Sequence, residues 1–375
     1  MGAYTITAVC GGETATAVVT IPDLTGDLTV TATVLDASAT VTGLSDDQAV
    51  TVDWGDGTAP DTVSLTDGAG TATHTYADAT GSPYTVTVTG NTSGAVLTAD
   101  VTVTPPPLTV TATTAADPQT TVTVTGIWAE DTTVTVDYGD AGTPEQLPVT
   151  GTAATAAHIY PQNGTYTVTV TGDVTGQTDS ADVTIAGWTD VVVDPMTSDA
   201  MWPALVYSTA LTTPAEMITG DASAEDGNLL RDTGYHLREY PDNIELDPTA
   251  LYRIAFRVRS SGTTPPQTYL GISGIAADGT TRVNGNGDDS PGAQYFAAAQ
   301  RATLPESGWT EYVGYLRGKS APATGGSEHH DPDDPGTFLE EVVYIRPIMS
   351  LAYKGDTTAV MDVDTVRLTS AQVPA

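Results

Sequence analysis

The first half of the chain alternates threonine with valine along short segments. Runs such as VTVDW at 50–54, YTVTVTG at 84–90 and TTVTVDYGD at 132–140 place valine at every second position. Successive side chains of a β-strand point to opposite faces of a sheet, so this period of two predicts strands that bury one face. Threonine and valine are also β-branched, which favours strands. Helical periodicity is missing from residues 1–186, so we expect this half to be all-β.

One pattern of strands and a turn occurs twice. The first copy reads AVTVDWGDGT, THTY and YTVTVTG, and the second reads TVTVDYGDAGT, AHIY and YTVTVTG. Corresponding positions of the two copies are Trp54 and Tyr138, Asp56 and Asp140, His74 and His158, and Tyr84 and Tyr166. Gly55 and Gly57 permit the positive φ of a tight turn, whose amides Asp56 can bind. Trp54 is expected between two sheets. These residues are therefore predicted to maintain the fold.

The repeated motifs resemble the polycystic-kidney-disease (PKD) type of immunoglobulin-like domain, in which a strand ending in WGDGT is followed by HxY and YxVxVTV strands. The second copy departs from this pattern, because tyrosine replaces the tryptophan and GDAGT replaces GDGT. The resemblance implies two complete Ig-like β-sandwiches, at residues 27–104 and 105–186. The proline run at 105–107 predicts a stiff connection between them.

Residues 4–21, YTITAVCGGETATAVVTI, have the pattern of the last hairpin of each repeat. Residues 1–26 are therefore predicted to be a partial Ig-like repeat. A two-stranded hairpin is marginal in water and needs a partner for its apolar face. The hairpin either docks on the sandwich that follows it, which is the simpler expectation, or completes a sheet of another chain. In the second case the partner is another copy of the chain or a capsid or tail protein.

Composition changes from about Trp188, where aromatic residues, arginine and longer loops replace the threonine-valine alternation. Strand-like runs separated by loops rich in glycine, proline and aspartate predict an antiparallel sandwich of roughly eight strands. The runs LDPTALYRIAFRVR, GWTEYVGYLRG, YIRPIMSLAY and MDVDTVRL resemble the carbohydrate-binding-module-like jelly rolls of glycan-binding proteins and of phage tail and fibre proteins. The resemblance implies a jelly-roll β-sandwich at residues 187–375.

The same resemblance implies a structural calcium ion, because the closing strand of such modules often supplies an aspartate to one. Asp364 matches that position best, and Asp362 points to the same face two residues away. The alternative is an exposed acidic strand end. Two loops also carry metal-compatible residues, NGNGDD at 284–289 and SEHHDPDD at 327–334. Neither has the spacing of a known metal site, so we expect both to be solvated loops.

Sugar binding by such a module would use aromatic rings stacked on sugar C–H surfaces. The candidate ligand-binding residues are Trp202, Tyr240 and Tyr295. Tyr240 and Tyr295 stand beside polar loops and are expected at the surface. Trp309 and Tyr344 are expected in the core, because one follows a turn into a strand and the other alternates with apolar residues.

Charge and motifs exclude several functions. Twelve lysine and arginine residues against 47 aspartate and glutamate residues give a net charge of −35, which repels nucleic acid and anionic lipid. Cys10 is the only cysteine, so no internal disulfide forms. No run reaches membrane-spanning length, and the N-terminus lacks the pattern of a secretion signal. No catalytic motif is present, so we do not expect an enzyme.

These observations favour a non-enzymatic structural protein of a phage virion, such as a capsid decoration, head fibre or minor tail protein. Ig-like domains would display a glycan-binding-like module for adhesion to the host surface, with virion proteins, further copies of the chain and a host glycan as partners. The alternative is a bacterial cell-surface adhesin or an accessory carbohydrate-binding module of a secreted enzyme. Calcium is the only expected cofactor, and the location is the virion or, in the alternative, the cell surface or extracellular space.

Overall fold

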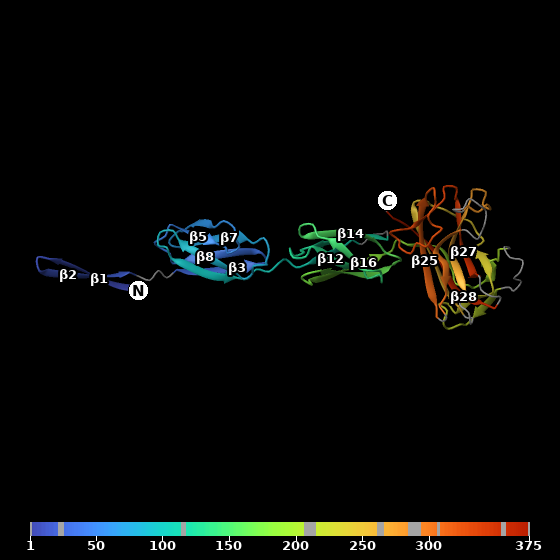
Figure 1. Ribbon diagram of the computed structural model, residues 1–375, viewed down its shortest axis with the longest axis horizontal. Helices are drawn as coiled ribbons and strands as arrows, with labels where there is room; N and C mark the ends of the chain where they lie inside the picture. The colour runs from blue at the N-terminus through green and yellow to red at the C-terminus, as the bar shows by residue number, and fades with distance from the viewer. Residues whose placement is uncertain are drawn as a thin grey trace.

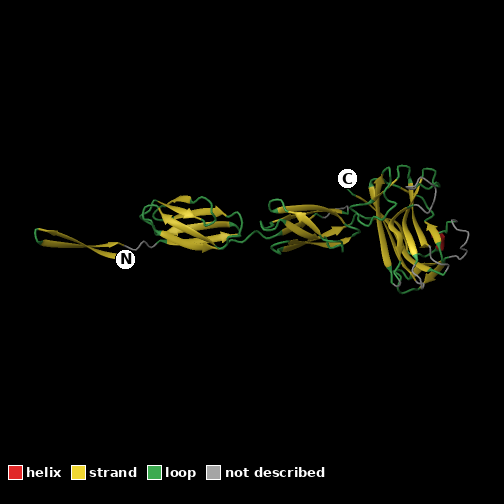
Figure 2. Cartoon of the chain, viewed as in Figure 1, coloured by secondary structure: helices red, strands yellow, loops and turns green. Residues whose placement is uncertain are grey.

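The computed structural model describes residues 2–21, 26–113, 118–205, 215–260, 266–283, 294–305, 308–353 and 358–373. Its described regular structure is β-strand apart from one short 3-10 helix, η1 (Asp199–Met201) (Figure 2). No helix in these ranges is long and apolar enough to cross a membrane. A hairpin, two small sandwiches and a larger C-terminal module follow one another along the long axis (Figure 1). The expected all-β fold, with tandem sandwiches and a C-terminal sandwich, is confirmed.

The N-terminal hairpin stands alone as a two-stranded sheet of β1 (Gly2–Cys10) and β2 (Glu13–Ile21). Positive φ angles at Gly11 and Gly12 close its turn. Every side chain from Thr5 to Val18 is exposed. The expectation that this hairpin docks on the first sandwich is therefore wrong for these side chains. Neither strand edge of the hairpin is paired with another strand in the part of the chain that the structure describes.

The first sandwich packs a three-stranded sheet on a four-stranded sheet. The first sheet contains β3 (Asp27–Thr33), β4 (Asp36–Thr42) and β7 (Gly70–Thr75), and the second contains β6 (Asp61–Ser64), β5 (Ala49–Asp53), β8 (Tyr84–Gly90) and β9 (Val96–Val101). Central strands such as β5 and β8 bury alternate side chains, as the period of two predicts. The core contains mainly valine and alanine around Trp54.

The second sandwich has the same topology. Its three-stranded sheet contains β10 (Thr109–Ala112), β11 (Gln119–Thr125) and β14 (Ala153–Ile159), and its four-stranded sheet contains β13 (Glu145–Pro148), β12 (Thr133–Asp137), β15 (Gly164–Gly172) and β16 (Thr178–Ile185). The sequence repeat is thus a repeat of structure, strand for strand.

The repeated motifs form one packed cluster in each sandwich. Trp54 stacks on His74 with ring centroids 5.0 Å apart, and His74 Nε2 lies 2.7 Å from Asp56 Oδ2. Gly55 has φ +78°, and a Cβ there would lie 2.6 Å from the Thr85 carbonyl oxygen, so only glycine fits this turn. The second sandwich repeats the stack and the ion pair with Tyr138, Asp140 and His158. The expected packing of the turn against the HxY strand is confirmed.

The C-terminal module packs a seven-stranded sheet on a five-stranded sheet. The larger sheet contains β17 (Thr189–Asp194), β18 (Glu216–Thr219), β19 (Asn228–Thr233), β28 (Val360–Gln372), β22 (Ala250–Ser260), β25 (Thr310–Lys319) and β26 (Gly336–Phe338). The smaller sheet contains β20 (His236–Glu239), β21 (Ile244–Glu245), β27 (Tyr344–Tyr353), β23 (Gln267–Ile275) and β24 (Tyr295–Thr303). The module has more strands than the roughly eight expected of a simple jelly roll.

The second sandwich and the module share a continuous apolar core. Trp188, Leu251 and Tyr315 are buried in the same cluster as the valines of that sandwich. The Trp188 indole Nε1 donates to the Tyr160 carbonyl oxygen at 3.0 Å. Asn163 accepts from the Trp188 backbone N–H at 2.9 Å and donates to its carbonyl at 2.8 Å. This packing fixes the module against the end of the sandwich.

Candidate functional site

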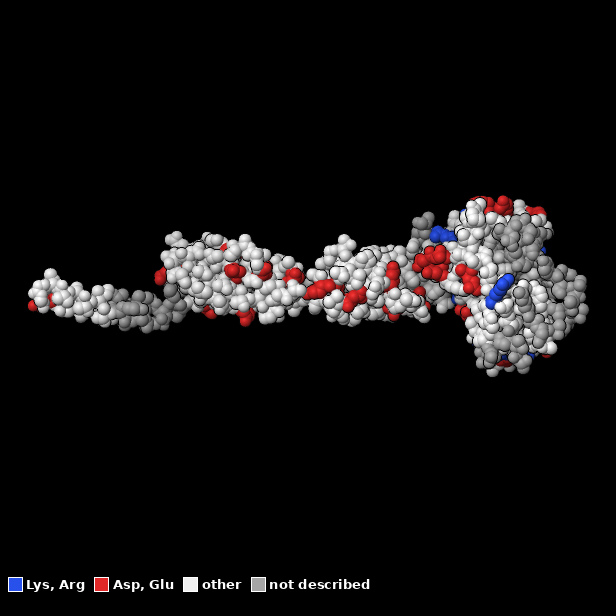
Figure 3. Space-filling model, in the orientation of Figure 1, with Lys and Arg blue, Asp and Glu red and all other residues white. Residues whose placement is uncertain are grey.

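Positive charge is confined to the C-terminal module. All twelve lysine and arginine residues follow residue 230, whereas aspartate and glutamate occur throughout the chain. In Figure 3 blue side chains accordingly lie only over the module, while red side chains cover both sandwiches as well. A site that uses cationic side chains can therefore lie only in the module or at its border.

Five arginines gather on the outer face of the seven-stranded sheet. In β22 the even-numbered residues from Tyr252 to Val258 enter the core between the two sheets, so the odd-numbered residues point outward. The five outward arginines are Arg231 of β19, Arg253, Arg257 and Arg259 of β22, and Arg367 of β28. Adjacent strands bring them together, because Asp362 is paired in register with both Arg231 and Arg259.

The two expected calcium ligands are bound to these arginines. Asp362 accepts from Arg231 Nε at 2.7 Å and from Arg259 Nε at 2.8 Å. Its hydrogen bonds raise the pKa of the Arg231 guanidinium above the usual value. Asp364 contacts Arg257 and accepts from the Glu225 backbone N–H at 3.0 Å. Both aspartates are fully buried, so the alternative of an exposed acidic strand end is wrong.

This donor set does not fit a calcium ion. A calcium site needs six to eight oxygen ligands, whereas the oxygens of Asp362 and Asp364 already accept from guanidinium groups that would repel a dication. Among the described residues, no group of three or more histidine, cysteine, aspartate or glutamate side chains is placed to hold a metal. The arginines also cover Trp309, with Arg259 Cζ 4.4 Å from the ring centroid.

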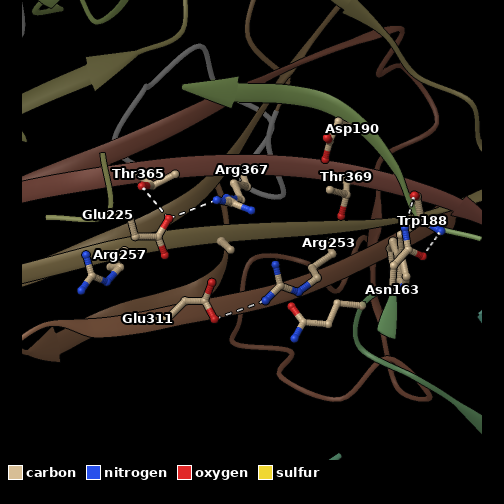
Figure 4. Close-up of a pocket in the computed structure, with 12 residues that line it drawn as sticks. Asn163, Trp188, Asp190, Glu225, Arg253, Arg257, Glu311, Thr365, Arg367 and Thr369 are labelled. Carbon is tan, nitrogen blue, oxygen red and sulfur yellow. Dashed lines mark hydrogen bonds and ion pairs between the residues drawn. The ribbon is translucent and has the colours of Figure 1, made fainter. Parts of the chain in front are cut away.

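A pocket of about 440 Å³ opens where this arginine face meets the second sandwich (Figure 4). Arg253, Thr369 and Arg367 line it from β22 and β28, and Glu311 lines it from β25. The rest of the lining comprises Gln162, Asn163, Trp188, Asp190, Glu225, Ala255, Arg257 and Thr365. The lining thus combines side chains of the module with the loop before β15 of the second sandwich.

Arg253 and Thr369 line this pocket, but Arg253 Nε and Thr369 Oγ1 are themselves buried and have no hydrogen-bond partner among the described residues. Arg253 is only 7% exposed, and its Nη2 lies 3.3 Å from Glu311 Oε2. Arg253 and Thr369 are cross-strand neighbours on β22 and β28. A buried polar group without a partner is costly. Because these two atoms are themselves buried, a ligand in the pocket would meet other atoms of the lining first.

The ionic contacts along the pocket differ in strength. Arg367 Nη2 donates to Glu225 Oε2 at 3.0 Å, shorter than the contact between Arg253 and Glu311. Beside Arg253, burial raises the pKa of the Tyr315 hydroxyl to about 12, although the guanidinium itself lowers it. Arg253 is thus a buried cation whose partners are the Tyr315 hydroxyl group and, at 3.3 Å, the Glu311 carboxylate.

The aromatic residues expected to bind sugar do not line this pocket. Trp202 is fully buried, and its Nε1 donates to Asp194 Oδ2 at 2.9 Å. Tyr295 is 1% exposed and packs on Phe338 at 4.9 Å, because the first residues of β24 are covered on both faces. The expectation of a surface position is wrong for Tyr295. Tyr240 is partly exposed and packs against Trp202.

Other sequence expectations have mixed outcomes. Trp309 and Tyr344, expected in the core, are half-buried. The segment 284–289 lies outside the described residues. In the 327–334 loop, His329 Nδ1 lies 3.0 Å from the Asp334 carbonyl oxygen and His330 Nδ1 lies 2.7 Å from the Val313 carbonyl oxygen. One nitrogen of each imidazole ring is thus engaged with a backbone carbonyl group.

A signal for the arginine face was present in the sequence. In YRIAFRVRS the arginines stand at positions 253, 257 and 259, which are four and two positions apart. They therefore share one face of a strand, opposite the apolar residues. The closing strand carries Asp362 and Asp364 with the same spacing of two. Complementary charges on two strands predict pairing with each other as readily as binding to a metal.

Comparison with known proteins gives only weak similarity. No family model matches the chain, and no curated protein matches its sequence. A solved carbohydrate-binding module of the β-sandwich superfamily is 14% identical, covering 70% of this chain and 98% of its own, with a TM-score of 0.27. SGBP-B from a complex xyloglucan utilization locus in Bacteroides uniformis is 11% identical, with coverages of 93% of this chain and 98% of its own and a TM-score of 0.25. The tandem CBM22-1–CBM22-2 domain of Paenibacillus barcinonensis Xyn10C is 11% identical, with coverages of 86% and 91% and a TM-score of 0.30. These TM-scores are too low to establish a shared fold.

Proposed function

We propose that this chain is a non-enzymatic glycan-binding surface protein. The two sandwiches serve as a spacer, and the pocket at the junction with the C-terminal module binds the sugar. The observation that carries this proposal is a pocket of about 440 Å³ whose lining combines guanidinium, carboxylate, amide and hydroxyl groups. Ligand pockets commonly measure roughly 300–1,000 Å³, so the volume suits a small saccharide unit.

The lining suits a polyhydroxylated ligand. Hydroxyl groups both donate and accept, so a sugar needs donors and acceptors at short intervals. Arg253, Arg367 and Thr369 provide donors, while Glu225, Glu311 and Asp190 provide acceptors. Apolar groups are few. This balance favours a sugar over a lipid or an apolar cofactor.

The arginine contacts of the two glutamates in the pocket favour binding over catalysis. Glu225 accepts from Arg367, and Glu311 accepts from Arg253. Glycoside hydrolysis requires a carboxyl group that is protonated and aimed at the glycosidic oxygen. Glutamates paired with guanidinium groups remain ionised and can accept hydrogen bonds from sugar hydroxyl groups instead.

The spacer arrangement is compatible with either of two locations. We assign the two sandwiches to the PKD type of immunoglobulin-like domain on their HxY motifs and on the WGD turn of the first, which becomes YGD in the second. Placed in line, they would hold the pocket away from an attachment point. The open strand edges of β1 and β2 favour attachment by strand addition to another protein. That protein is a bacterial surface component or, as the sequence led us to expect, a capsid or tail protein of a phage.

A glycan array probed with the full-length chain tests the proposal. We expect binding to at least one class of oligosaccharide, weakened about tenfold or more by Arg253→Ala, because a hydrogen bond to a charged group is lost. Arg301→Ala is the matched control, since Arg301 is exposed on the five-stranded sheet and contacts Tyr269. Equal binding by the two variants, or no binding by the wild-type chain, would overturn the proposal.

A further inference from the structure

We propose that a loop of the C-terminal module is a pH-dependent clasp on the second sandwich. The loop connects β25 to β26 and covers residues 320–335. It is closed on the sandwich when the His329 imidazole carries a proton on both ring nitrogens, and it opens when one of these protons is lost. The clasp belongs to the junction itself and is independent of what the pocket beside Trp188 binds.

The backbone of His329 is fixed on two strands of the module. Its N–H donates to the Ala297 carbonyl oxygen of β24 at 2.9 Å, and its carbonyl oxygen accepts from the Tyr315 N–H of β25 at 2.8 Å. These two strands belong to different sheets. The imidazole ring therefore has a fixed place at the base of the loop, from which it can hold the residues on either side of it.

Both nitrogens of this ring lie against backbone carbonyl groups. Nδ1 is 3.0 Å from the Asp334 oxygen, and Nε2 is 3.0 Å from the Thr324 oxygen. A carbonyl oxygen only accepts hydrogen bonds, and a neutral imidazole donates from one nitrogen alone. The Ser327 hydroxyl group donates to the same Thr324 oxygen at 3.0 Å and is 3.3 Å from Nε2, so its proton serves the carbonyl. Both imidazole hydrogen bonds therefore form together only when the ring is protonated.

The Asp334 contact places the neighbouring Asp333 against the second sandwich. The Asp333 carboxylate accepts from the Ile159 N–H of β14, and one of its oxygens lies 3.8 Å from His158 Nδ1. Burial raises the pKa of the Asp333 carboxyl group, so the ionised carboxylate docks at a cost. Its position on the sandwich therefore depends on the closed form of the loop.

The groups around the loop determine what the loss of a proton does. No lysine or arginine is among the described residues that line the space between the loop and the sandwich. The titratable groups of that lining are Tyr138, Asp140, Glu145 and His158 of the sandwich, His330, Asp331 and Asp333 of the loop, and Tyr315 of β25. Nearer to the ring, the loop adds Glu328 and Asp334, and the strands packed on the loop add Tyr295 and Tyr312. Burial raises the pKa of all four tyrosines, so they stay neutral while the imidazoles titrate. Without a proton on the imidazoles, carboxylates of the loop face carboxylates of the sandwich and repel them.

The direction of the pH dependence follows from where the proton binds. The closed loop holds a proton that the open loop gives up. A state that binds more protons gains stability as the pH falls, so the clasp closes toward acid and opens toward alkali. Imidazole groups change charge between about pH 5 and pH 8, which is the range in which the change is expected.

Hydrogen exchange of the full-length chain, followed at the Ile159 amide, tests the clasp. Rates at about pH 5.5 and about pH 8, each divided into the rate of an unstructured reference peptide, give a protection factor. We expect the wild-type factor to be about tenfold larger at the lower pH, because loss of a hydrogen bond to a charged group opens the loop. His329→Gln should show equally low protection at both pH values. His330→Gln is the matched control, since the His330 side chain is 56% exposed, and it should keep the wild-type difference.

Three outcomes would overturn the clasp. One is equal protection of the Ile159 amide at both pH values in the wild type. Another is a pH difference that persists in His329→Gln and disappears in His158→Gln, which would assign the proton to His158. The third needs no variant and covers the case in which His329→Gln fails to fold. Nitrogen chemical shifts of the wild-type His329 ring should show a proton on both nitrogens at about pH 5.5, and a neutral ring at that pH contradicts the proposal.

Discussion

At the scale of single residues, Asp362 shows how one carboxylate organises a sheet face. It is fully buried, lies between Arg231 of β19 and Arg259 of β22, and receives hydrogen bonds from both. An aspartate in a closing strand can hold a metal or an arginine, and sequence alone leaves the choice open. The neighbouring strands decide it, because they place guanidinium groups opposite the aspartate.

Asp362→Ala is predicted to destabilise the C-terminal module. Breaking a buried ion pair costs roughly 3–5 kcal/mol, but partial exposure of Arg231 and Arg259 reduces this to about 2 kcal/mol or more. Urea unfolding followed by tryptophan fluorescence measures the change, with Asp242→Ala at an exposed site as the control. A loss as small as that of the control would contradict the role of this residue.

Calcium is predicted to leave the melting temperature unchanged. An ion stabilises a protein only if it binds the folded state, and the arginines beside Asp362 and Asp364 occupy the space of such a site. Differential scanning calorimetry in calcium and in chelator should give equal melting temperatures. A rise of several degrees with calcium would contradict this prediction.

The sandwiches are predicted to lose stability in acid through their Asp-His pairs. The hydrogen bond from His158 lowers the pKa of Asp140 below its usual value of 3.8. A carboxyl whose pKa is lower in the folded state stabilises the fold above its unfolded-state pKa, and this is lost as the pH falls through the folded value. Melting temperature should therefore drop below about pH 4. His158→Gln should show a smaller drop between pH 5 and 3, and an equal drop would contradict this origin.

At the scale of elements, the period of two was sufficient to predict the strands of both sandwiches. Valine at alternate positions of β5 and β8 fixes which face is buried, and the WGD turn fixes where the strands reverse. In the module, the surface position expected for Tyr295 from the polar loop beside it is wrong, because β24 is covered on both faces and has no exposed side at its start. Burial there is decided by the strands that cover β24, which are far apart in the sequence.

The N-terminal hairpin is predicted to mediate association with another chain. Its side chains from Thr5 to Val18 are exposed, and both strand edges are unpaired within the described structure, which favours strand addition. Deleting residues 1–22 should convert a self-associating chain to a monomer, or abolish attachment to a virion or surface partner. Sedimentation analysis and circular dichroism measure association and folding together. Unchanged association after the deletion would show that the attachment surface lies elsewhere.

At the scale of the whole molecule, the junction between the second sandwich and the module is the structural centre of the proposed function. Trp188 fills the end of the sandwich core and also lines the pocket. The change in composition marked Trp188 as the start of a new module. Composition could not show, however, that the second sandwich and the C-terminal module share a core. The pocket escaped prediction for the same reason, because its walls come from Asn163, Arg253 and Thr369, which only the folded chain brings together.

Trp188→Ala is predicted to weaken the junction by about 3–5 kcal/mol, the cost of truncating a buried tryptophan. The sandwich and the module should then move relative to each other, and glycan affinity should fall because the pocket loses one wall. Small-angle scattering measures the change in shape. Trp128→Ala, beside the proline connection at the opposite end of the same sandwich, should leave glycan affinity unchanged. If the Trp188→Ala variant keeps both the shape and the glycan affinity of the wild type, the proposal that the binding site lies at the junction is wrong.

A crystal structure of the full-length chain with its tightest-binding oligosaccharide tests the central claim most directly. The account predicts that the sugar occupies the pocket between the loop before β15 and the outer face of β22 and β28. Oxygens of the sugar should lie within hydrogen-bonding distance of the guanidinium and carboxylate groups that line the pocket, among them Arg367 and Glu311. A sugar bound at Tyr240 or on the five-stranded sheet, with the pocket empty, would contradict it.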